Sequence, residues 1–422
     1  MATTILSIGL VVFLAHFLAL QFRRTNVPDV LVLVLVGITV GPLLGIVHPE
    51  DFGKLGSVIA TIALVVILFE GGTSLDLATL GRTAGTTGLL TLTCFALSAA
   101  AVVGVAIMAF DLAWIPALLL GATLGGTASA VVIPMVGSLK VSPKPATVLV
   151  MESVLTDVLC IIGVFALLQV AAEGQVNGAQ VAGSVLAALI FATVIGVTGG
   201  AGWMLVLGRV RGFPNTISST LAYVFIVYGV TESLGFSGAI AALAMGVTLS
   251  NHTRLGLDRL VPTAVSIEPL NQQDLDFFRE AVFLLKTYFF VYLGISVRFG
   301  DAGLAGVALA MVGLIFVLRL PVTRIVFRSP EYGLRDTAIV SMMAPKGLAA
   351  AVLATLPLQA GIEGGELIRD LAYMVVLVSV ALTALLVIML PWSSTQWTYS
   401  KLLGKPIDGS SDQHEAPPDK AS

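Results

Sequence analysis

Two acidic side chains stand close together in the middle of a long apolar segment. Glu152 and Asp157 begin and end the run Glu-Ser-Val-Leu-Thr-Asp, inside an apolar stretch from Ala146 to Ala172 that is long enough to cross a bilayer. An ionised Asp at the bilayer centre costs about 2.5–3.5 kcal/mol even on the lenient insertion scale. Function is the usual reason for keeping such a group at that depth, so the segment predicts a site inside the membrane.

Helical geometry assigns the two acids different tasks. Ser153 and Asp157 are four residues apart and share a helix face, whereas Glu152 points about 140° away from Asp157. Asp157 and Ser153, with Thr127 as a predicted neighbour, offer hard oxygen ligands to a small monovalent cation. Because burial favours the neutral acid, a proton and a metal ion could compete for this carboxylate. Glu152 needs a cationic partner, for which Arg319 is predicted; alternatively, the two lie at opposite interfaces.

Two further segments carry residues that interrupt a helix. They read Leu124-Gly125-Gly126-Thr127-Ala128-Ser129-Ala130 and Ala344-Pro345-Lys346-Gly347-Leu348. Because glycine and proline weaken the helical ladder, we expect two discontinuous helices that cross near mid-membrane. Lys346 is predicted to offset the partial negative charge of the half-helix carboxyl ends. The alternatives are that the glycines serve helix packing and that Lys346 snorkels to an interface.

The composition is that of an all-α polytopic membrane protein, with 57% hydrophobic and 11% charged residues. Hydropathy divides the chain into about thirteen spans of roughly 17–25 residues. Their approximate centres are Phe13, Leu35, Val65, Ala99, Thr127, Thr156, Thr193, Phe225, Ala242, Phe290, Gly313, Lys346 and Leu382. The spans around Phe225 and Ala242 are the shortest of the set.

Lys and Arg gather in every second loop, as they do in cytoplasmic loops of membrane proteins. The amino terminus is therefore predicted outside and the carboxyl terminus inside, in a plasma or inner membrane. An odd number of helices with ends on opposite sides fits two inverted six-helix repeats joined by one linking helix. The short polar tail, residues 396–422, is predicted to be cytoplasmic and disordered. The polar loop from Asn251 to Arg279 fits either an amphipathic connector or a pH sensor or partner site.

These motifs resemble those of the cation/proton antiporters, in particular sodium/proton exchangers of the NhaP type. Glu152 to Asp157 is similar to the family's Glu-Ser-x-x-Asn-Asp signature, Leu68 to Gly72 to its third-helix motif, and Ala344 to Gly347 to its Gly-Pro-Arg-Gly. Pro28 to Pro42 and Lys286 to Ile295 are weaker matches. The resemblance runs over nearly all of residues 1–395.

The resemblance implies a homodimer in which a transport core rocks past a dimerisation part. It implies that Asp157, Ser153, the Thr127 carbonyl and Glu70 hold the cation, while a Glu152–Arg319 pair stabilises the core. Thr156 joins the candidate site because it stands where the family has Asn or Asp; Ala128-Ser129 replaces the Asp-Pro that often follows Thr127. The implied parts are a core at about 85–172 and 302–391, a dimerisation part at about 3–80 and 217–299, and a linking helix at about 180–207.

The sequence therefore predicts a secondary transporter, not an enzyme, that exchanges Na⁺, or else K⁺ or Li⁺, for H⁺ by alternating access. Exchange is expected to be electroneutral because Thr156 is uncharged, and no cofactor or nucleic acid is expected. The alternatives are a K⁺/H⁺ antiporter, a sodium-coupled symporter and a passive cation channel. An intramembrane protease is disfavoured because Asp157 is the sole deep Asp and no His-Glu-x-x-His occurs.

Overall fold

The computed structural model describes residues 29–49, 53–75, 77–173, 178–210, 217–257, 270–297, 302–329 and 331–406, together with Gly9, Phe13, His16 and Phe17. Within these ranges the regular structure is helical and contains no strand. In the described part of the chain, six helices are long and apolar enough to cross a membrane, and four more apolar segments are shorter. The bilayer therefore explains the architecture: with no water in the lipid core, each crossing segment must satisfy its backbone hydrogen bonds internally.

The helices follow one another along the chain with short connections. In order they are α2 (Asp29–Ile38), the π-helix η1 (Thr39–Leu43), α3 (Gly53–Thr73), α4 (Leu77–Phe110), α5 (Trp114–Leu124), α6 (Ser129–Ser138), α7 (Pro143–Glu173), α8 (Gly178–Val210), α9 (Ile217–Ser233), α10 (Gly238–Ser250), α11 (Gln272–Ser296), α12 (Ala302–Val326), α13 (Leu334–Met342), α14 (Leu348–Leu353), α15 (Leu356–Gln359), α16 (Gly365–Met389) and α17 (Ser393–Leu403).

Each predicted span from the second onward coincides with a helix or a pair of half-helices. The two short spans are the separate helices α9 and α10, which are divided by a turn at Gly235 with φ +80°. Ser237 caps α10 by accepting a hydrogen bond from the Ile240 amide at 3.4 Å. The predicted span around Phe13 lies outside the described residues apart from a few positions. The total of thirteen helices and the inverted repeat therefore stay predictions.

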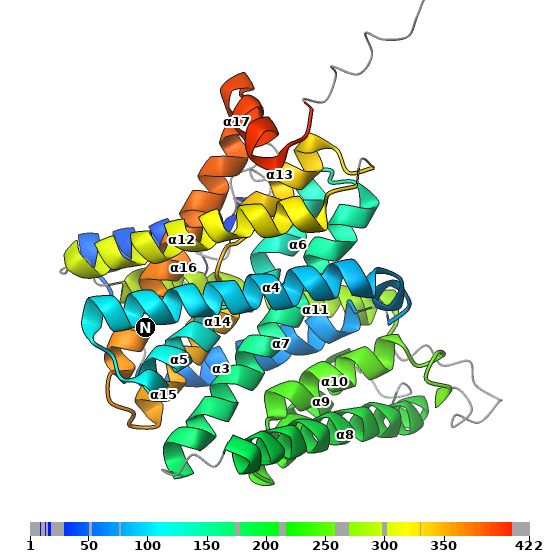
Figure 1. The fold of residues 1–422 in the computed structure, drawn as a ribbon. Coiled ribbons are helices and arrows are strands. Elements are labelled where there is room, and N and C mark those ends of the chain that lie inside the picture. The colour runs from blue at the N-terminus through cyan, green and yellow to red at the C-terminus, as the bar shows by residue number, and fades with distance from the viewer. Residues whose placement is uncertain are drawn as a thin grey trace, which may run out of the picture.

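The contacts between the helices divide them into two groups, and Figure 1 shows α8, α9 and α10 of the second group side by side. In one group α4 packs against α5, α7 and α12, while α16 packs against α5 and α12. In the other group α10 packs against α3, α8 and α9, and α11 packs against α2 and α3. Contacts of α7 with α8, of α14 with α3 and of α16 with α2 join the groups. The first group contains both interrupted helices, so it holds the candidate site.

Close glycine contacts bind the second group together. A Cβ added to Gly37 of α2 would lie 2.1 Å from the Val291 carbonyl oxygen, and one added to Gly294 of α11 would lie 2.2 Å from the Val34 carbonyl oxygen. Gly72 of α3 and Gly246 of α10 form a second such crossing. Small residues let helix backbones approach closely in a membrane, where van der Waals packing drives association.

The expected disorder of residues 396–422 is wrong for its first part. Residues 393–403 form α17, which packs on α12 and α13. Tyr399 and Leu403 are buried four residues apart on one helix face, a pattern that the polar composition of the tail conceals. Beyond the helix, the Lys405 ammonium donates hydrogen bonds to the carbonyl oxygens of Ser329, at 3.1 Å, and Tyr332. Residues 407–422 lie outside the described part of the chain.

The predicted polar loop 251–279 is also shorter than expected at its carboxyl end. Helix α11 begins at Gln272, so residues 272–279 are helical. A capping box fixes this start: the Asn271 side chain accepts from the Asp274 amide at 2.7 Å, and the Asp274 carboxylate accepts from the Asn271 amide at 3.0 Å. Residues 258–269 lie outside the described residues.

Candidate functional site

The two interrupted helices cross each other at their breaks, where the backbone is not helical. Helix α5 ends at Leu124 and α6 begins at Ser129, while α13 ends at Met342 and α14 begins at Leu348. Between these half-helices, the Ala128 amide donates a hydrogen bond to the Pro345 carbonyl oxygen at 2.8 Å. Gly347 allows the contact, since a Cβ there would lie 2.4 Å from the Ala128 Cβ.

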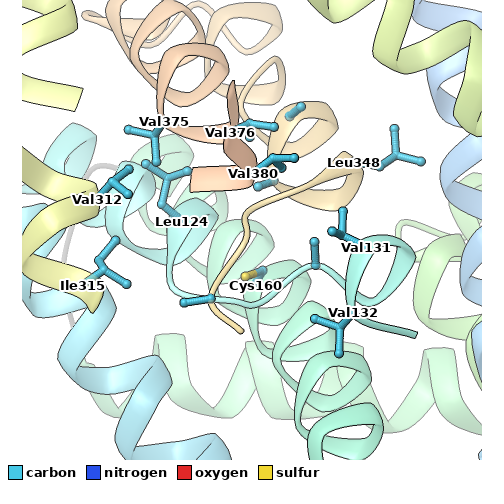
Figure 2. Packing of buried hydrophobic residues seen from close by; sticks show 14 of the residues in the cluster. Leu124, Val131, Val132, Cys160, Val312, Ile315, Leu348, Val375, Val376 and Val380 are labelled. Carbon is cyan, nitrogen blue, oxygen red and sulfur yellow. The ribbon is translucent and has the colours of Figure 1, made fainter. Parts of the chain in front are cut away.

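Apolar side chains enclose the crossing. Figure 2 shows them converging from α5, α6, α7, α12, α14 and α16 around the two extended segments; those labelled include Leu124, Val131, Cys160, Val312, Leu348 and Val376. All six are 3% exposed or less. Charged groups inside such a shell interact through a low effective dielectric, so each of them requires a specific partner.

A cation meets the carboxyl end of the first half of each interrupted helix. The Lys346 ammonium donates to the Gly126 carbonyl oxygen at 2.7 Å, just beyond the end of α5. The Arg319 Nε donates to the Val340 carbonyl oxygen at 2.9 Å, in the last turn of α13. Both cations are buried. Half-helix carboxyl ends carry partial negative charge, so these contacts stabilise the breaks electrostatically.

The structure brings Glu152 and Arg319 together as a bidentate pair. The Arg319 Nη1 and Nη2 atoms donate to the Glu152 Oε1 and Oε2 atoms at 2.9 and 3.0 Å, respectively. The Thr127 hydroxyl donates to the same carboxylate at 3.1 Å. Glu152 is completely buried, and every charge of the pair is matched. This carboxylate is thus held by a permanent countercharge.

Asp157 is held differently, by uncharged donors. Its Oδ2 accepts a hydrogen bond from the Ser129 hydroxyl at 2.6 Å and a longer one from the Ser129 amide at 3.4 Å. Ser129 is the first residue of α6, so the carboxylate faces the positive end of that half-helix. Within the described residues, neither Lys346 nor Arg319 donates a hydrogen bond to Asp157.

Three further predicted residues connect the first break to α7. The Thr156 hydroxyl accepts from the Thr127 amide at 3.0 Å and donates to the Ser153 carbonyl oxygen at 3.0 Å. The Ser153 hydroxyl donates to the Val150 carbonyl oxygen of its own helix at 2.9 Å. Thr127, Ser153 and Thr156 are all buried. The break at Thr127 is therefore tied by hydrogen bonds to the part of α7 that carries Asp157.

Glu70 is the predicted site residue for which the described residues show no hydrogen bond to the crossing. It lies on α3, and its carboxylate is within reach of the Ser74 hydroxyl and of the Arg279 charge. No contact of Glu70 with Asp157 occurs within the described part of the chain. The described part of the chain contains no group of three or more His, Cys, Asp and Glu residues that could hold a metal ion. A site built on hydroxyls, carbonyls and a single carboxylate suits a monovalent ion better than a divalent one.

Sequence reasoning did not include Ser129, Ser379 or Cys160 in the site. The Ser379 hydroxyl accepts from the Lys346 amide at 2.9 Å, and the Cys160 sulfur accepts from the Gly126 amide at 3.1 Å. The helix-capping preference of serine gives no signal for Ser129, because Ala128 and not Ser129 occupies the N-cap position of α6. Ser379 and Cys160 carry no signal either, since only the packing of α16 and α7 places them there.

The chain belongs to the family of transmembrane sodium/hydrogen exchangers, whose family model matches residues 9–390. It is 26% identical over 369 residues to the K⁺/H⁺ antiporter NhaP2 of Shewanella oneidensis, covering 84% of this chain and 61% of that protein. It is 28% identical over 399 residues to the K⁺/H⁺ antiporter NhaP of Alkalimonas amylolytica, covering 89% and 64%. The chain thus spans less than two thirds of the length of these relatives.

Another relative and a solved structure are also similar to this chain. The Na⁺/H⁺ antiporter NhaS2 of Synechocystis is 26% identical over 303 residues, which cover 70% of this chain and 53% of that protein. The solved structure of the sodium proton antiporter MjNhaP1 from Methanocaldococcus jannaschii at pH 8 has a TM-score of 0.70 at 20% identity, covering 91% of this chain and 99% of that one. This similarity shows that the chain shares the antiporter fold.

Proposed function

We propose that this protein exchanges a monovalent cation for protons across the membrane, and that Asp157 is the group for which the two ions compete. One observation carries the proposal: of the two buried acids on α7, Glu152 is neutralised by Arg319, whereas Asp157 has only hydroxyl and amide donors. A buried carboxylate without a permanent countercharge needs a proton or a metal ion to balance it.

The remaining ligands are proposed from the oxygens gathered at the crossing. The Thr127 carbonyl, the Ser153 hydroxyl and the Thr156 hydroxyl are proposed to complete the site, because all three residues are buried and offer hard oxygen atoms. Glu70 is proposed to approach from α3 during the cycle. Because Lys346 and Arg319 hold the half-helix ends, the crossing can keep its shape while the ion changes.

Alternating access is proposed to come from movement between the two helix groups. The group of α4–α7 and α12–α16 contains the site and would act as the transport core, while α2, α3 and α9–α11 would form the dimerisation part with α8 as the link. A homodimer in the plasma membrane, with the amino terminus outside and the carboxyl terminus inside, is part of this proposal. The contacts between the helices support this division.

The stoichiometry is proposed to be one proton for one cation. Only Asp157 changes its occupant, because Glu152 stays paired and Thr156 is uncharged. Sodium is the first cation to test. Potassium is the second candidate, favoured by the relatives named K⁺/H⁺ antiporters and by the apolar Ala128 next to Thr127, which weakens the field at the site.

The deciding experiment compares Asp157→Asn with the matched control Asp111→Asn in proteoliposomes that enclose a pH-sensitive dye. Asp111 is exposed in the α4–α5 loop with φ +51°, a conformation that Asn accepts well. We expect cation-driven dequenching to vanish in Asp157→Asn and to persist in Asp111→Asn. Exchange by a folded Asp157→Asn protein would show that the ions do not compete at this carboxylate.

The same vesicles test the finer points. Sodium, potassium and lithium are supplied in turn, and the direction of the pH change in the lumen separates antiport from sodium-coupled symport. Clamping the membrane potential at several values then tests the stoichiometry. A rate that is independent of potential is expected, and a rate that follows the potential contradicts one-for-one exchange.

A further inference from the structure

Helix α17 lies where two long membrane helices end. Only residues 390–392 separate it from α16, and both α16 and α12 are long and apolar enough to cross a membrane. Arg324, in the last turn of α12, donates a hydrogen bond to the Leu402 carbonyl oxygen of α17 at 3.3 Å. Because α17 adjoins the ends of both helices, it lies at the level where apolar segments leave the lipid, in the interfacial region of a bilayer.

The buried and exposed faces of α17 differ in character. Tyr399 packs against the protein, whereas Trp397 points about 160° away from it around the helix and is 55% exposed. The Lys401 ammonium lies over the Trp397 ring, 3.8 Å from its centroid. Trp392, at the N-cap, is 58% exposed. Trp is enriched at membrane interfaces, where its ring meets apolar groups and its N–H meets polar ones, so this face fits the headgroup region of a bilayer.

The surface around α17 carries positive charge without acidic residues in the same segments. Arg324 and Arg328 are exposed at the end of α12, and Lys401 is exposed in the last turn of α17. No Asp or Glu occurs in residues 302–330 or 371–407. In the part of the chain that the structure describes, none of these three cations forms an ion pair. Exposed cations at the end of a membrane helix attract anionic lipid headgroups.

We propose that the exposed face of α17 and the adjoining end of α12 form a binding site for an anionic phospholipid. Lys401 and Arg324 bind the phosphate of its headgroup, and the Trp397 ring packs against the glycerol region and the first carbons of the acyl chains. A lipid fits this surface better than a free phosphate ion does, because a soluble anion would leave the exposed indole ring without an apolar partner. The site involves neither Asp157 nor the exchanged cation.

A lipid bound to this face should hold α17 in place on α13, beside which it lies in Figure 1. The Tyr399 hydroxyl of α17 is within hydrogen-bonding reach of Ser341. Ser341 follows Val340, whose carbonyl oxygen accepts the hydrogen bond from Arg319 at the break. Lipid binding at α17 should therefore stabilise the half-helix α13 as well, which makes the thermal unfolding midpoint a readout of binding.

The test titrates the full-length protein in uncharged detergent with phosphatidylglycerol, and the apparent Kd is taken from the rise in the unfolding midpoint. Phosphatidylcholine, which has no net charge, should bind more weakly. Lys401→Gln should raise the Kd for phosphatidylglycerol about fivefold, which corresponds to about 1 kcal/mol for a cation at the lipid surface. Lys401→Arg keeps the charge and should bind like the wild type, while Trp397→Ala should weaken binding because the ring is lost.

Two control variants lie outside the proposed site. Lys144 is exposed but paired with Glu331 at 2.7 Å, and Trp114, at the start of α5, is 70% exposed. Lys144→Gln and Trp114→Ala should leave the Kd unchanged. A loss of affinity in these controls as large as in Lys401→Gln and Trp397→Ala would show unspecific attraction to lipid and would overturn the proposal.

Three further outcomes would contradict the site. Equal affinities for phosphatidylglycerol and phosphatidylcholine would show that the headgroup charge is not recognised. If glycerol phosphate protects the protein as well as phosphatidylglycerol does, the ligand is a soluble anion and not a lipid. Wild-type affinity should also fall as the salt concentration rises, because exposed charges are screened, and an affinity independent of salt overturns the proposal even if a variant fails to fold.

Discussion

The helix crossing and the glycine contacts solve the same problem, close approach of two backbones, by opposite means. Where α3 meets α10, Gly72 and Gly246 remove side chains so that the helices touch, and the contact depends on shape alone. Where the interrupted helices meet, Lys346 and Arg319 offset the partial negative charge of the half-helix carboxyl ends. A contact based on shape has one good arrangement, whereas hydroxyls and charges can exchange partners. This difference explains why ion binding is proposed at the crossing of the interrupted helices and why the glycine contact between α3 and α10 is expected to be rigid.

The largest effect should come from breaking the buried ion pair at the crossing. Arg319→Met leaves the Glu152 carboxylate buried with only the Thr127 hydroxyl beside it, and it also frees the Val340 carbonyl oxygen. Removing one partner of a buried pair costs about 3–5 kcal/mol. The thermal unfolding midpoint of the detergent-solubilised protein should therefore fall steeply.

The matched control removes both charges. In the double variant Glu152→Gln with Arg319→Met no unpaired charge remains, so most of the lost stability should return, since neutral replacements of buried pairs are often tolerated. A double variant as unstable as Arg319→Met alone would mean that the Arg319 contact with Val340, and not the pair, supports the crossing.

The next effect should come from the glycine contact. Ala at position 246 places a Cβ 2.2 Å from the Phe69 carbonyl oxygen, which forces α3 and α10 apart. Overpacking of this kind costs about 1–3 kcal/mol, more than the gain of about 0.5–1 kcal/mol from replacing a helical Gly by Ala. Gly246→Ala should lower the unfolding midpoint without moving the pH midpoint of exchange.

Gly313→Ala is the control for this contact, because nothing lies within 4 Å of a Cβ at that position of α12. Its unfolding midpoint should match or slightly exceed that of the wild type. If both alanine variants behave alike, the close approach of α3 and α10 contributes no stability.

A smaller effect is expected at Ser379 of α16. Its buried hydroxyl accepts the hydrogen bond of the Lys346 amide, so Ser379→Ala leaves a buried N–H without a partner, at a cost of about 1–2 kcal/mol. The exposed Thr198, whose hydroxyl donates within its own helix, is the control: Thr198→Ala should be neutral. Equal unfolding midpoints for the two variants would contradict the expected cost.

The smallest effect should come from the exposed ion pair of Lys144 and Glu331, 2.7 Å apart. The hydrogen bond and charge of Lys144 hold the pKa of Glu331 below its usual range. A lowered carboxyl pKa contributes stability above the pKa of the unfolded chain and loses it as the pH falls through the folded value. Because both side chains are at least half exposed, solvent screens the pair, and Glu331→Gln should not change the unfolding midpoint measurably at neutral or acidic pH.

The sequence predicts the spans well because twenty apolar residues in a row have few alternatives to a membrane helix. It also predicts that Glu152 and Arg319 need partners, since a deep charge without one is costly. It could not tell that Ser129 turns to Asp157, because that depends on how α6 leaves the break. The sequence also did not reveal α17, because only three of its residues, Thr395, Tyr399 and Leu403, are buried.

The Lys405 contacts have a practical consequence for handling the protein. Lys405 follows α17 and donates hydrogen bonds to carbonyl oxygens between α12 and α13, so a truncation before Ser393 would remove these bonds and the packing of α17 on both helices. Purification tags and reporter fusions are therefore best attached after residue 406, where they leave α17 and the Lys405 hydrogen bonds in place.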